Sequence, residues 1–352
     1  MIRENAGDGE RMRKIKVEEA VGLAVAHDMT EIDPDRGIKR VAFRKRTVIK
    51  KSDIEKLKSL GREHVFVFED VENEIHEDEA ALELAPLLAG ENIVFDSEPK
   101  EGKISLYADC DGLFKVDKER VVAVNRLKIP SLPTLHDNFV VEKGKQVAAF
   151  RIIPLTCERK VIDECRGILA AGLRPPLAVK PFVNRRAALI VTGNEVYTGR
   201  IEDKFTAIIE KKLSEFGVEL VQKCILPDDG ERIRRTITEY AAGVDFLVLT
   251  GGTSVDPDDA TKAAMRAAGI ELLQEGNPLQ PGNNFTIGYL GEKPVCAVPA
   301  AAIFFATTAF DLFLPRFIAA DPVTADELAE LSVGGLCHFC KVCRYPICPF
   351  GR

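Results

Sequence analysis

The second half of the chain alternates short apolar runs with amphipathic segments, and this alternation limits the possible folds more than any other feature. Four apolar runs, each the length of a strand, are separated by segments of helical periodicity: 187–192, 218–226, 244–250 and 293–299. In 203–217, for example, the apolar residues form one stripe, and Gly217 follows as a stop signal. A last helix is predicted over 300–317. Strands that alternate with helices predict an α/β fold with a doubly wound, mostly parallel sheet.

The first half of the chain is less regular. Helices are predicted over 17–26, 52–61, 77–90 and 162–172. Residues 92–155 carry short apolar runs between Gly, Asp and Pro, including 120–124, which is typical of β-structure. Prolines in 173–186 predict an extended linker.

These changes of pattern divide the chain into four segments. We expect an N-terminal α+β segment over 1–75, a β-rich segment with the Pro-rich linker over 76–180, an α/β domain over 185–320 and a Cys-rich tail over 321–352.

Charge and apolar content exclude several classes of protein. The net charge of −7 argues against a general nucleic-acid binder, which would carry a basic surface. The N-terminus lacks the apolar core of a signal peptide, and the apolar stretch 296–310 is shorter than the ~20 residues that span a bilayer. We therefore expect a cytoplasmic protein that binds neither nucleic acid nor membrane. Its nine cysteines are then more typical of free, catalytic or metal-bound thiols than of disulfides.

Three polar loops follow predicted strands, over 192–205, 226–233 and 250–262. The carboxyl ends of parallel strands meet at one edge of a sheet, where ligands bind. In the third loop, Gly251 and Gly252 allow backbone amides to converge on an anion, and Thr253 and Ser254 add hydroxyl donors. The carboxylates that follow are suited to magnesium. A capped helix start is the alternative, because Asp256 is a good N-cap.

The other two loops leave similar alternatives open. Glu195 is either a ligand or a solvated charge. Asp203 is either part of a site or the N-cap of the following helix, and the same choice holds for Asp228 and Asp229 before the helix near Glu231. Three such loops at one edge of a sheet favour a binding pocket.

The motifs TGNEVYTGRIEDKF, LPDDGERI, TGGTSVDPDDATK and QPGNNF together resemble the molybdopterin-binding domain of molybdenum-cofactor biosynthesis proteins. Molybdopterin adenylyltransferases and molybdopterin molybdotransferases share this domain, and the likeness covers roughly 185–320. The stretches HDMTEIDPD, IHEDEAA, RIIPLT and FDLFLPRFIA, with the Cys-rich tail, resemble a bacterial branch of molybdotransferase-like proteins.

The resemblance implies a ligand, a reaction and a set of site residues. The ligand is molybdopterin or its adenylate, and the reaction is insertion of molybdate or tungstate with Mg²⁺-assisted cleavage of the adenylate. The implied catalytic residues are Glu195, Asp228 and Asp259. Asp259 is also the implied Mg²⁺ ligand. Implied binding residues are Thr192, Gly193, Asn194, Asp203, Gly251, Gly252, Thr253, Ser254, Lys262, Pro281 and Gly282. The resemblance also implies a homodimer.

Four places depart from the family's pattern. Asn194 stands where the family has Asp, Phe205 where it often has Asn, and Asn284 where it has a second Pro. The sequence PAAA at 299–302 replaces a turn that contains glycine. These changes favour a non-catalytic carrier or sensor of molybdopterin as an alternative. A molybdopterin adenylyltransferase is a further alternative, and a third is a scaffold for a metal-binding tail.

The tail has four closely spaced cysteines, Cys337, Cys340, Cys343 and Cys348. Two, two and four residues separate them, a spacing at which thiolates bind zinc or an iron–sulfur cluster. The alternative is a flexible tail with reduced, unligated thiols.

Overall fold

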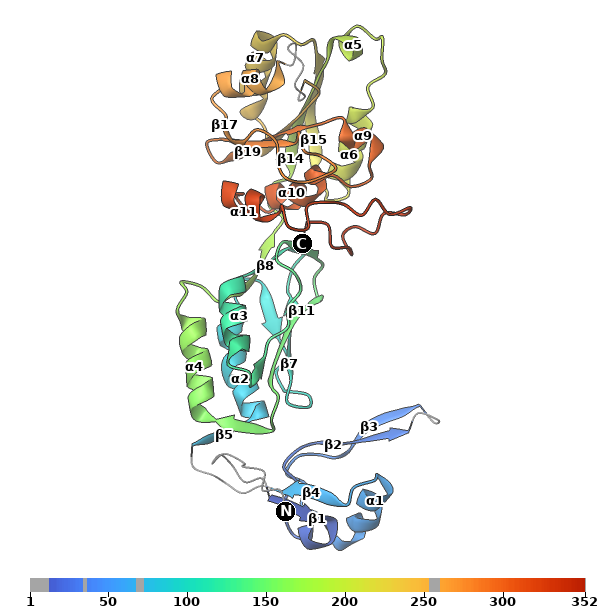
Figure 1. Ribbon diagram of the computed structural model, residues 1–352, viewed down its shortest axis with the longest axis vertical. Helices are drawn as coiled ribbons and strands as arrows, with labels where there is room; N and C mark the ends of the chain where they lie inside the picture. The colour runs from blue at the N-terminus through green and yellow to red at the C-terminus, as the bar shows by residue number, and fades with distance from the viewer. Residues whose placement is uncertain (1–12, 34–36, 68–72, 253–259, 352) are drawn as a thin grey trace. The chain divides into compact units, whose positions relative to one another are not determined.

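The computed structural model describes residues 13–33, 37–67, 73–252 and 260–351. The chain forms two compact units (Figure 1). Unit 1 comprises Met1–Cys110, Phe114–Asp137 and Glu142–Val179, and unit 2 comprises Asp111–Leu113, Asn138–Val141 and Lys180–Arg352.

Unit 1 begins with small antiparallel pairings around a core of its own. Its first elements are β1 (Arg13–Lys16), the 3-10 helix η1 (Val17–Ala20), β2 (Met29–Asp33), β3 (Ile38–Phe43), η2 (Lys51–Asp53), α1 (Ile54–Ser59) and β4 (His64–Val67). β1 pairs with β4, and β2 pairs with β3. The helix predicted over 17–26 is wrong beyond η1. Gly22 has a φ of +88°, and the amide of Val25 donates to Thr47 O at 3.0 Å, so the chain leaves the helix to pair with other segments.

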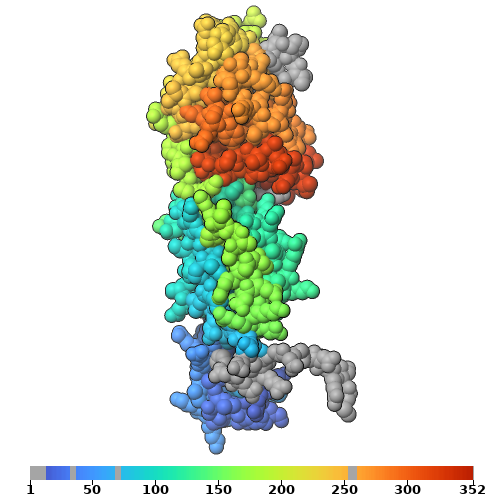
Figure 2. All heavy atoms as spheres, turned by 90° about the vertical axis from the view of Figure 1, so that its left-hand side faces the viewer, coloured from blue at the N-terminus to red at the C-terminus, as the bar shows by residue number. Residues whose placement is uncertain are grey.

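The remainder of unit 1 combines helices with a β-rich part. Its helices are α2 (Glu77–Leu88), α3 (Lys118–Arg126) and α4 (Arg159–Ala170). One sheet has the order β6-β7-β11-β9, from β6 (Ile93–Phe95), β7 (Ile104–Ala108), β9 (Pro130–Ser131) and β11 (Gln146–Ile152). β5 (Glu74–His76) pairs with β12 (Thr156–Glu158). α4 packs on α2 and α3, and its light-green outer face is visible in Figure 2.

Two predictions for the first half need correction. The apolar run 120–124 is not a strand but lies in α3, because the side chain of Asp117 accepts a hydrogen bond from Arg120 N at 3.0 Å and starts a helix. The linker predicted as extended over 173–186 bends before Leu177, and part of it is the paired strand β13 (Leu177–Pro181). That strand belongs to a sheet of order β10-β8-β13, with β8 (Gly112–Val116) and β10 (Phe139–Val141).

Unit 2 has the predicted α/β architecture. Its six-stranded sheet has the order β15-β14-β16-β19-β18-β17. The strands are β14 (Arg186–Thr192), β15 (Glu219–Leu226), β16 (Phe246–Thr250), β17 (Glu271–Gln274), β18 (Thr286–Leu290) and β19 (Lys293–Val298). β15, β14, β16 and β19 are parallel, whereas β18 and β17 form an antiparallel edge that the sequence pattern did not predict.

Alternate residues of each central strand enter two separate cores, which makes the sheet doubly wound. In β14, Leu189 and Val191 pack with α6 (Phe205–Ser214) and α10 (Ala309–Ile318). Ala188 and Ile190 pack on the opposite face with α7 (Gly230–Ala241) and α8 (Thr261–Ala267). Figure 1 shows α7 and α8 together on one side of the sheet.

The closing helix predicted over 300–317 is wrong, because the chain breaks into α9 (Ala301–Phe304) and α10. Thr308 starts α10 with a capping box in which its amide donates to Asp311 Oδ2 at 2.7 Å. Phe305 is extended between the two helices, and Phe304 is 77 % exposed. The short helices α5 (Asn194–Tyr197) and α11 (Ala325–Glu330) complete unit 2. In the described part of the chain, no helix has the length and apolarity needed to cross a membrane.

Candidate functional site

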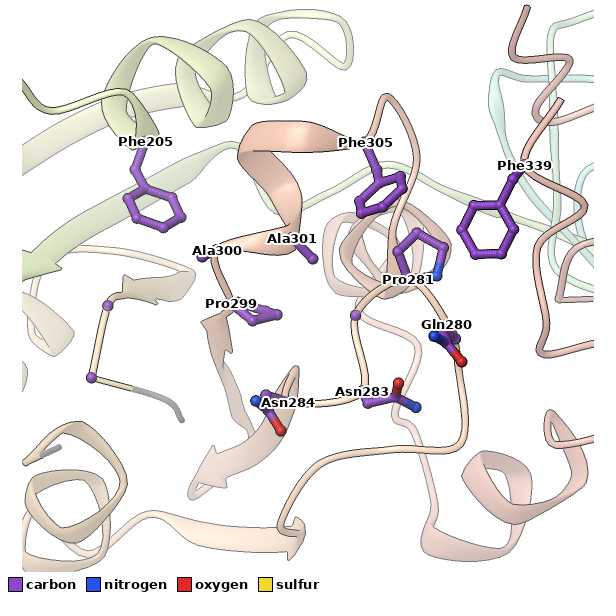
Figure 3. A pocket seen from close by; sticks show the side chains of 13 residues that line it. Phe205, Gln280, Pro281, Asn283, Asn284, Pro299, Ala300, Ala301, Phe305 and Phe339 are labelled. Atoms are coloured by element: carbon purple, nitrogen blue, oxygen red, sulfur yellow. The ribbon is translucent and has the colours of Figure 1, made fainter. Parts of the chain in front are cut away.

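A pocket of about 470 Å³ lies at the carboxyl ends of β16 and β19 (Figure 3). Three backbone segments form it: Gly251 and Gly252 after β16, the loop 280–284, and the turn 299–301 after β19. Aromatic side chains complete the lining, from Phe205, Phe305 and Phe339. Of the three loops expected at this edge, 250–262 lines the cavity with its two glycines, 192–205 contributes only Phe205, and 226–233 contributes no described residue. The expected Pro281 and Gly282 and the turn that departs from the family's pattern line the same cavity.

Both glycines after β16 are required by close packing. Gly251 has a φ of +81°, and a Cβ on it would lie 2.1 Å from Thr192 O. Gly252 has a φ of +50°, and its Cβ would lie 2.6 Å from Thr261 Oγ1. Neither position accepts a side chain without movement of the neighbouring backbone or of buried Thr261. The loop is therefore pressed against the ends of β14 and α8.

Buried hydroxyl groups fix this contact. Thr192 Oγ1 donates to Thr250 O at 3.1 Å and lies 3.0 Å from Thr261 Oγ1. Thr261 Oγ1 lies 3.0 Å from Gly251 O, to which it donates. Thr192 is only 3 % exposed and does not line the pocket, so its hydroxyl positions the glycine loop from behind.

The loop 280–284 is held by hydrogen bonds to its own backbone. Gly282 has a φ of +113°, and a Cβ there would lie 3.0 Å from both the amide nitrogen and the Cβ of Ala309. Ala309 N donates to Pro281 O at 3.2 Å, and Asn277 Nδ2 donates to Gly282 O at 2.9 Å. The first residue of α10 thus packs on this loop and fixes one wall of the pocket.

The described lining carries no charged side chain. Figure 3 shows Phe205, Phe305 and Phe339 along one side and the amide side chains along the other. The amides belong to Gln280, Asn283 and Asn284. The rings of Phe305 and Phe339 are 5.8 Å apart at 58°. Rings facing amides suit a flat, neutral heterocycle with hydrogen-bonding edges.

Sequence reasoning missed much of this lining. In the sequence, Phe205 stands out as part of the apolar stripe in 203–217 and, like Asn284, as a departure from the family's pattern, whereas nothing marks Phe305 or Phe339. Phe339 comes from the tail, far along the chain, so only the tertiary structure joins it to the site.

A second, acidic group lies at the ends of β14 and β15. Asn194 N donates to Asp228 Oδ2 at 2.9 Å, and Asp228 N donates to Asn194 Oδ1 at 3.2 Å. Asp228 Oδ1 is buried and has no hydrogen-bond partner among the described residues. Glu195 is exposed in α5. The neutral amide of Asn194 therefore ties the two loops together beside a carboxylate with a free oxygen.

Two carboxylates act as helix caps. Asp203 Oδ1 accepts from Phe205 N at 2.8 Å, which caps α6. Asp229 Oδ1 accepts from the amides of Glu231 and Arg232, both at 3.0 Å, which caps α7. The capping alternative therefore describes the contacts of both residues.

The remaining expected residues are distributed as follows. Gly193 separates β14 from α5 with a φ of +140°. Lys262 is half-buried in the first turn of α8 and has no ion pair within the described residues. Thr253, Ser254, Asp256 and Asp259 lie outside the described residues. Among the residues that are described, no three His, Cys, Asp or Glu side chains are gathered to hold a metal ion, and this includes the tail cysteines.

Residues 188–319 match the family described as probable molybdopterin binding domain. This stretch of unit 2 belongs to that family. The molybdopterin-binding domain supplies every described residue of the pocket lining except Phe339. Residues 14–69 match a second family, described as Domain of unknown function (DUF8806).

Curated relatives are similar to part of the chain. A CinA-like protein of Citrifermentans bemidjiense is 34 % identical over 108 residues, which cover 30 % of this chain and 26 % of that protein. A CinA-like protein of Fervidobacterium nodosum is 29 % identical over 120 residues, which cover 34 % of this chain and 29 % of that protein. The match thus spans little more than a quarter of the length of these relatives.

The solved structures that are similar to this chain include proteins of molybdopterin biosynthesis. The molybdopterin biosynthesis enzyme MoaB from Thermus thermophilus is 16 % identical with a TM-score of 0.31, and the match covers 40 % of this chain and 98 % of that one. The molybdopterin biosynthesis MoeA protein from Pyrococcus horikoshii is 14 % identical with a TM-score of 0.33, covering 88 % and 75 %.

Proposed function

We propose that the protein binds molybdopterin or its adenylate in the pocket at the ends of β16 and β19. We further propose that it inserts molybdate or tungstate, with cleavage of the adenylate to release AMP. The observation that supports this most is the neutral pocket of rings and amides inside a domain of the molybdopterin-binding family. Its aromatic rings suit a pterin, and its amides match the hydrogen-bonding edge of a pterin.

The edge of the sheet has two halves: the pocket at the ends of β16 and β19, and the acidic half around Asp228 at the ends of β14 and β15. Together they suggest how the ligand lies. The pterin ring occupies the half lined by Phe205, Phe305 and the amides. The phosphate lies toward Gly251 and Gly252, where backbone amides and the start of α8 favour an anion. The reacting phosphorus then points toward Asp228, in the acidic half.

The donor set of the acidic half fits Mg²⁺. Magnesium is usually held by one or two carboxylates together with waters and substrate phosphates. Asp228 Oδ1 is a buried oxygen that lacks a partner among the described residues, and Asp259 is the second proposed ligand. A bound Mg²⁺ would neutralise charge on the phosphates. Asn194 holds Asp228 in place through the paired hydrogen bonds, while the phenylalanines exclude water from the pterin side.

Release of AMP from molybdopterin adenylate tests the catalytic proposal. The purified protein, Mg²⁺ and molybdate should release AMP, and Asp228→Asn and Asp259→Ala should each reduce the rate by at least about tenfold. Asp229→Asn is the matched control, because Asn also caps helices and Asp229 lies next to Asp228. Equal rates in wild type and Asp228→Asn would reject the proposed role of Asp228.

A carrier of molybdopterin is the second candidate, and one observation favours it. The family has an acidic residue at this position, whereas Asn194 is neutral. Its backbone amide and its side-chain oxygen both bond to Asp228, so this position contributes no charge for a cation. Tight binding of the pterin without AMP release, in the same assay, would identify a carrier. Formation of the adenylate from ATP and molybdopterin would instead identify an adenylyltransferase.

We also propose a homodimer by analogy with the family. Light scattering measures the molar mass in solution and tests this proposal.

A further inference from the structure

The Cys-rich tail carries chemistry that the proposed function does not use. All four of its cysteines line one pocket of about 470 Å³, which is distinct from the pterin pocket. The pocket wall also contains Phe304, Phe305 and Phe339, and two of these rings belong to the pterin pocket as well. Cys340 and Cys343 are exposed, and Cys337 and Cys348 are partly buried. The fold of the tail therefore brings all four cysteines to the wall of one pocket.

The tail is a closed loop with fixed ends. Gly351 N donates to Gly334 O at 3.0 Å, which joins the two ends of the loop. Cys337 N donates to Gln280 O at 2.8 Å, and Tyr345 Oη donates to Asp311 O at 3.0 Å. Phe350 is buried in the core beside α10. These contacts hold the loop against unit 2 at several points.

The middle of the loop has no core of its own. Val342 is 68 % exposed and Ile347 is 82 % exposed, so these two apolar side chains face solvent. No helix or strand is found between 337 and 351. A segment without regular structure or a core of its own gains stability from a disulfide or a metal ion. None of the nine cysteines forms a disulfide, so all four tail thiols are available to bind a metal ion.

One of the sulfur atoms accepts a hydrogen bond, and a second lies within hydrogen-bond distance of a hydroxyl. Phe339 N donates to Cys337 Sγ at 3.4 Å, and Thr307 Oγ1 lies 3.2 Å from Cys343 Sγ. An amide that points at the sulfur two residues earlier stabilises a metal-bound thiolate. Phe339 reaches this position with a φ of +50°, a conformation that non-glycine residues seldom adopt. Lys341 and Arg344 line the same pocket and offset part of the charge of four thiolates.

We propose that Cys337, Cys340, Cys343 and Cys348 bind one zinc ion. Every gap between successive cysteines is two or four residues, within the range of structural zinc sites. No three of the described His, Cys, Asp or Glu side chains are gathered for a metal as they stand, so the four thiols converge by side-chain rotation when the ion binds, and each loses its proton. Zinc then fixes Phe339, and through it the wall that the loop shares with the pterin pocket. The zinc site itself does not depend on what the pterin pocket binds.

Metal content and protease resistance test the proposal on the full chain. After reduction and addition of zinc, elemental analysis of the desalted protein should find about one zinc per chain. The double variant Cys340→Ser, Cys343→Ser should retain none, and Cys110→Ser, a partly buried cysteine outside the tail, should retain it. In the zinc-bound wild type, trypsin should cleave after Lys341 and Arg344 at least about tenfold more slowly than in the chelator-treated protein.

Three outcomes would overturn the proposal. The first is a zinc-treated protein in which all four tail thiols react freely with a thiol reagent. The second is a double variant that binds zinc as tightly as the wild type, with an unchanged far-ultraviolet spectrum as proof of folding. The third is an anaerobically purified protein with the visible absorption of an iron–sulfur cluster, which would replace zinc. Cobalt, used as a spectroscopic probe, should show tetrahedral thiolate bands in the wild type and lose them in the double variant.

Discussion

Gly251 has two roles: it allows close packing of the loop after β16, and it lines the candidate binding pocket. Its positive φ and its missing Cβ allow the loop to lie on Thr192 O, and the same backbone lines the pocket. Gly251→Ala should lower the free energy of unfolding by at least about 3 kcal/mol, because strain in φ adds to a backbone clash. Gly199→Ala is the matched control. Gly199 has a φ of +72° with nothing within 4 Å of its Cβ, so it should lose only about 1 kcal/mol. Urea unfolding measures both, and equal losses would contradict the clash.

We expect His76 to make unit 1 sensitive to acid. Its Nε2 donates to Ala26 O at 3.0 Å, while Nδ1 accepts from Asp78 N at 3.1 Å and lies 2.6 Å from Lys45 Nζ, which requires the neutral ring. Burial, together with Lys45, lowers the pKa of His76 below its ordinary value of 6.5, against the opposing effect of Asp78 and Glu79. Unfolding therefore takes up a proton. The stabilising contribution of the neutral ring is complete above about pH 6.5 and is lost as the pH falls from there toward the lower folded pKa.

Unfolding in urea at two pH values tests this residue. The free energy of unfolding of unit 1 should fall between about pH 7.5 and about pH 5.5, and His76→Gln should make that fall smaller although it destabilises the protein at the higher pH. The exposed His64→Gln should behave as the wild type. An equally steep fall in His76→Gln would assign the effect elsewhere, for example to His27, whose pKa burial also lowers.

At the scale of elements, the break between α9 and α10 shapes the pocket. It places Phe305 in an extended segment, where its ring meets Phe339 instead of lying on a helix face. The capping box of Thr308 and Asp311 starts α10. Thr308→Val should lower the free energy of unfolding of unit 2 by about 1 kcal/mol, whereas Thr308→Ser keeps the oxygen and should lose much less. If the two variants have the same urea midpoint, the cap does not stabilise the start of α10.

The elements show which parts of the structure a sequence can predict. The β/α order of unit 2 was predictable, because each strand and helix has its own period and its own stop signal, as Gly217 shows. The run 120–124 was not, since a short apolar run fits a strand or a helix equally well until Asp117 is seen to cap it. The glycine loop was predictable from local sequence. The aromatic wall was not, because Phe205, Phe305 and Phe339 meet only after folding.

At the scale of the whole molecule, the two units have separate cores and separate sensitivities. The core around β1 and β4 belongs to unit 1, and the two cores on either face of the six-stranded sheet belong to unit 2. The proposed pterin pocket and the proposed zinc loop are both in unit 2, while the acid-sensitive His76 is in unit 1. Ligand and acid should therefore act on different unfolding transitions.

Calorimetry can separate these effects in the intact chain. Molybdopterin at about 100 times its Kd should stabilise unit 2 by about 2.7 kcal/mol and raise its transition by about 5–10 °C, while the transition of unit 1 stays in place. Acidification should lower the unit 1 transition with less effect on the other. Phe305→Ala should reduce the ligand-induced shift, because that ring lines the proposed pterin pocket. Phe304→Ala should preserve it, because the neighbouring ring is 77 % exposed and lies outside the proposed pterin pocket. A ligand that shifted both transitions equally would mean that the units unfold together, and an equal shift in the two variants would place the ligand away from the aromatic wall.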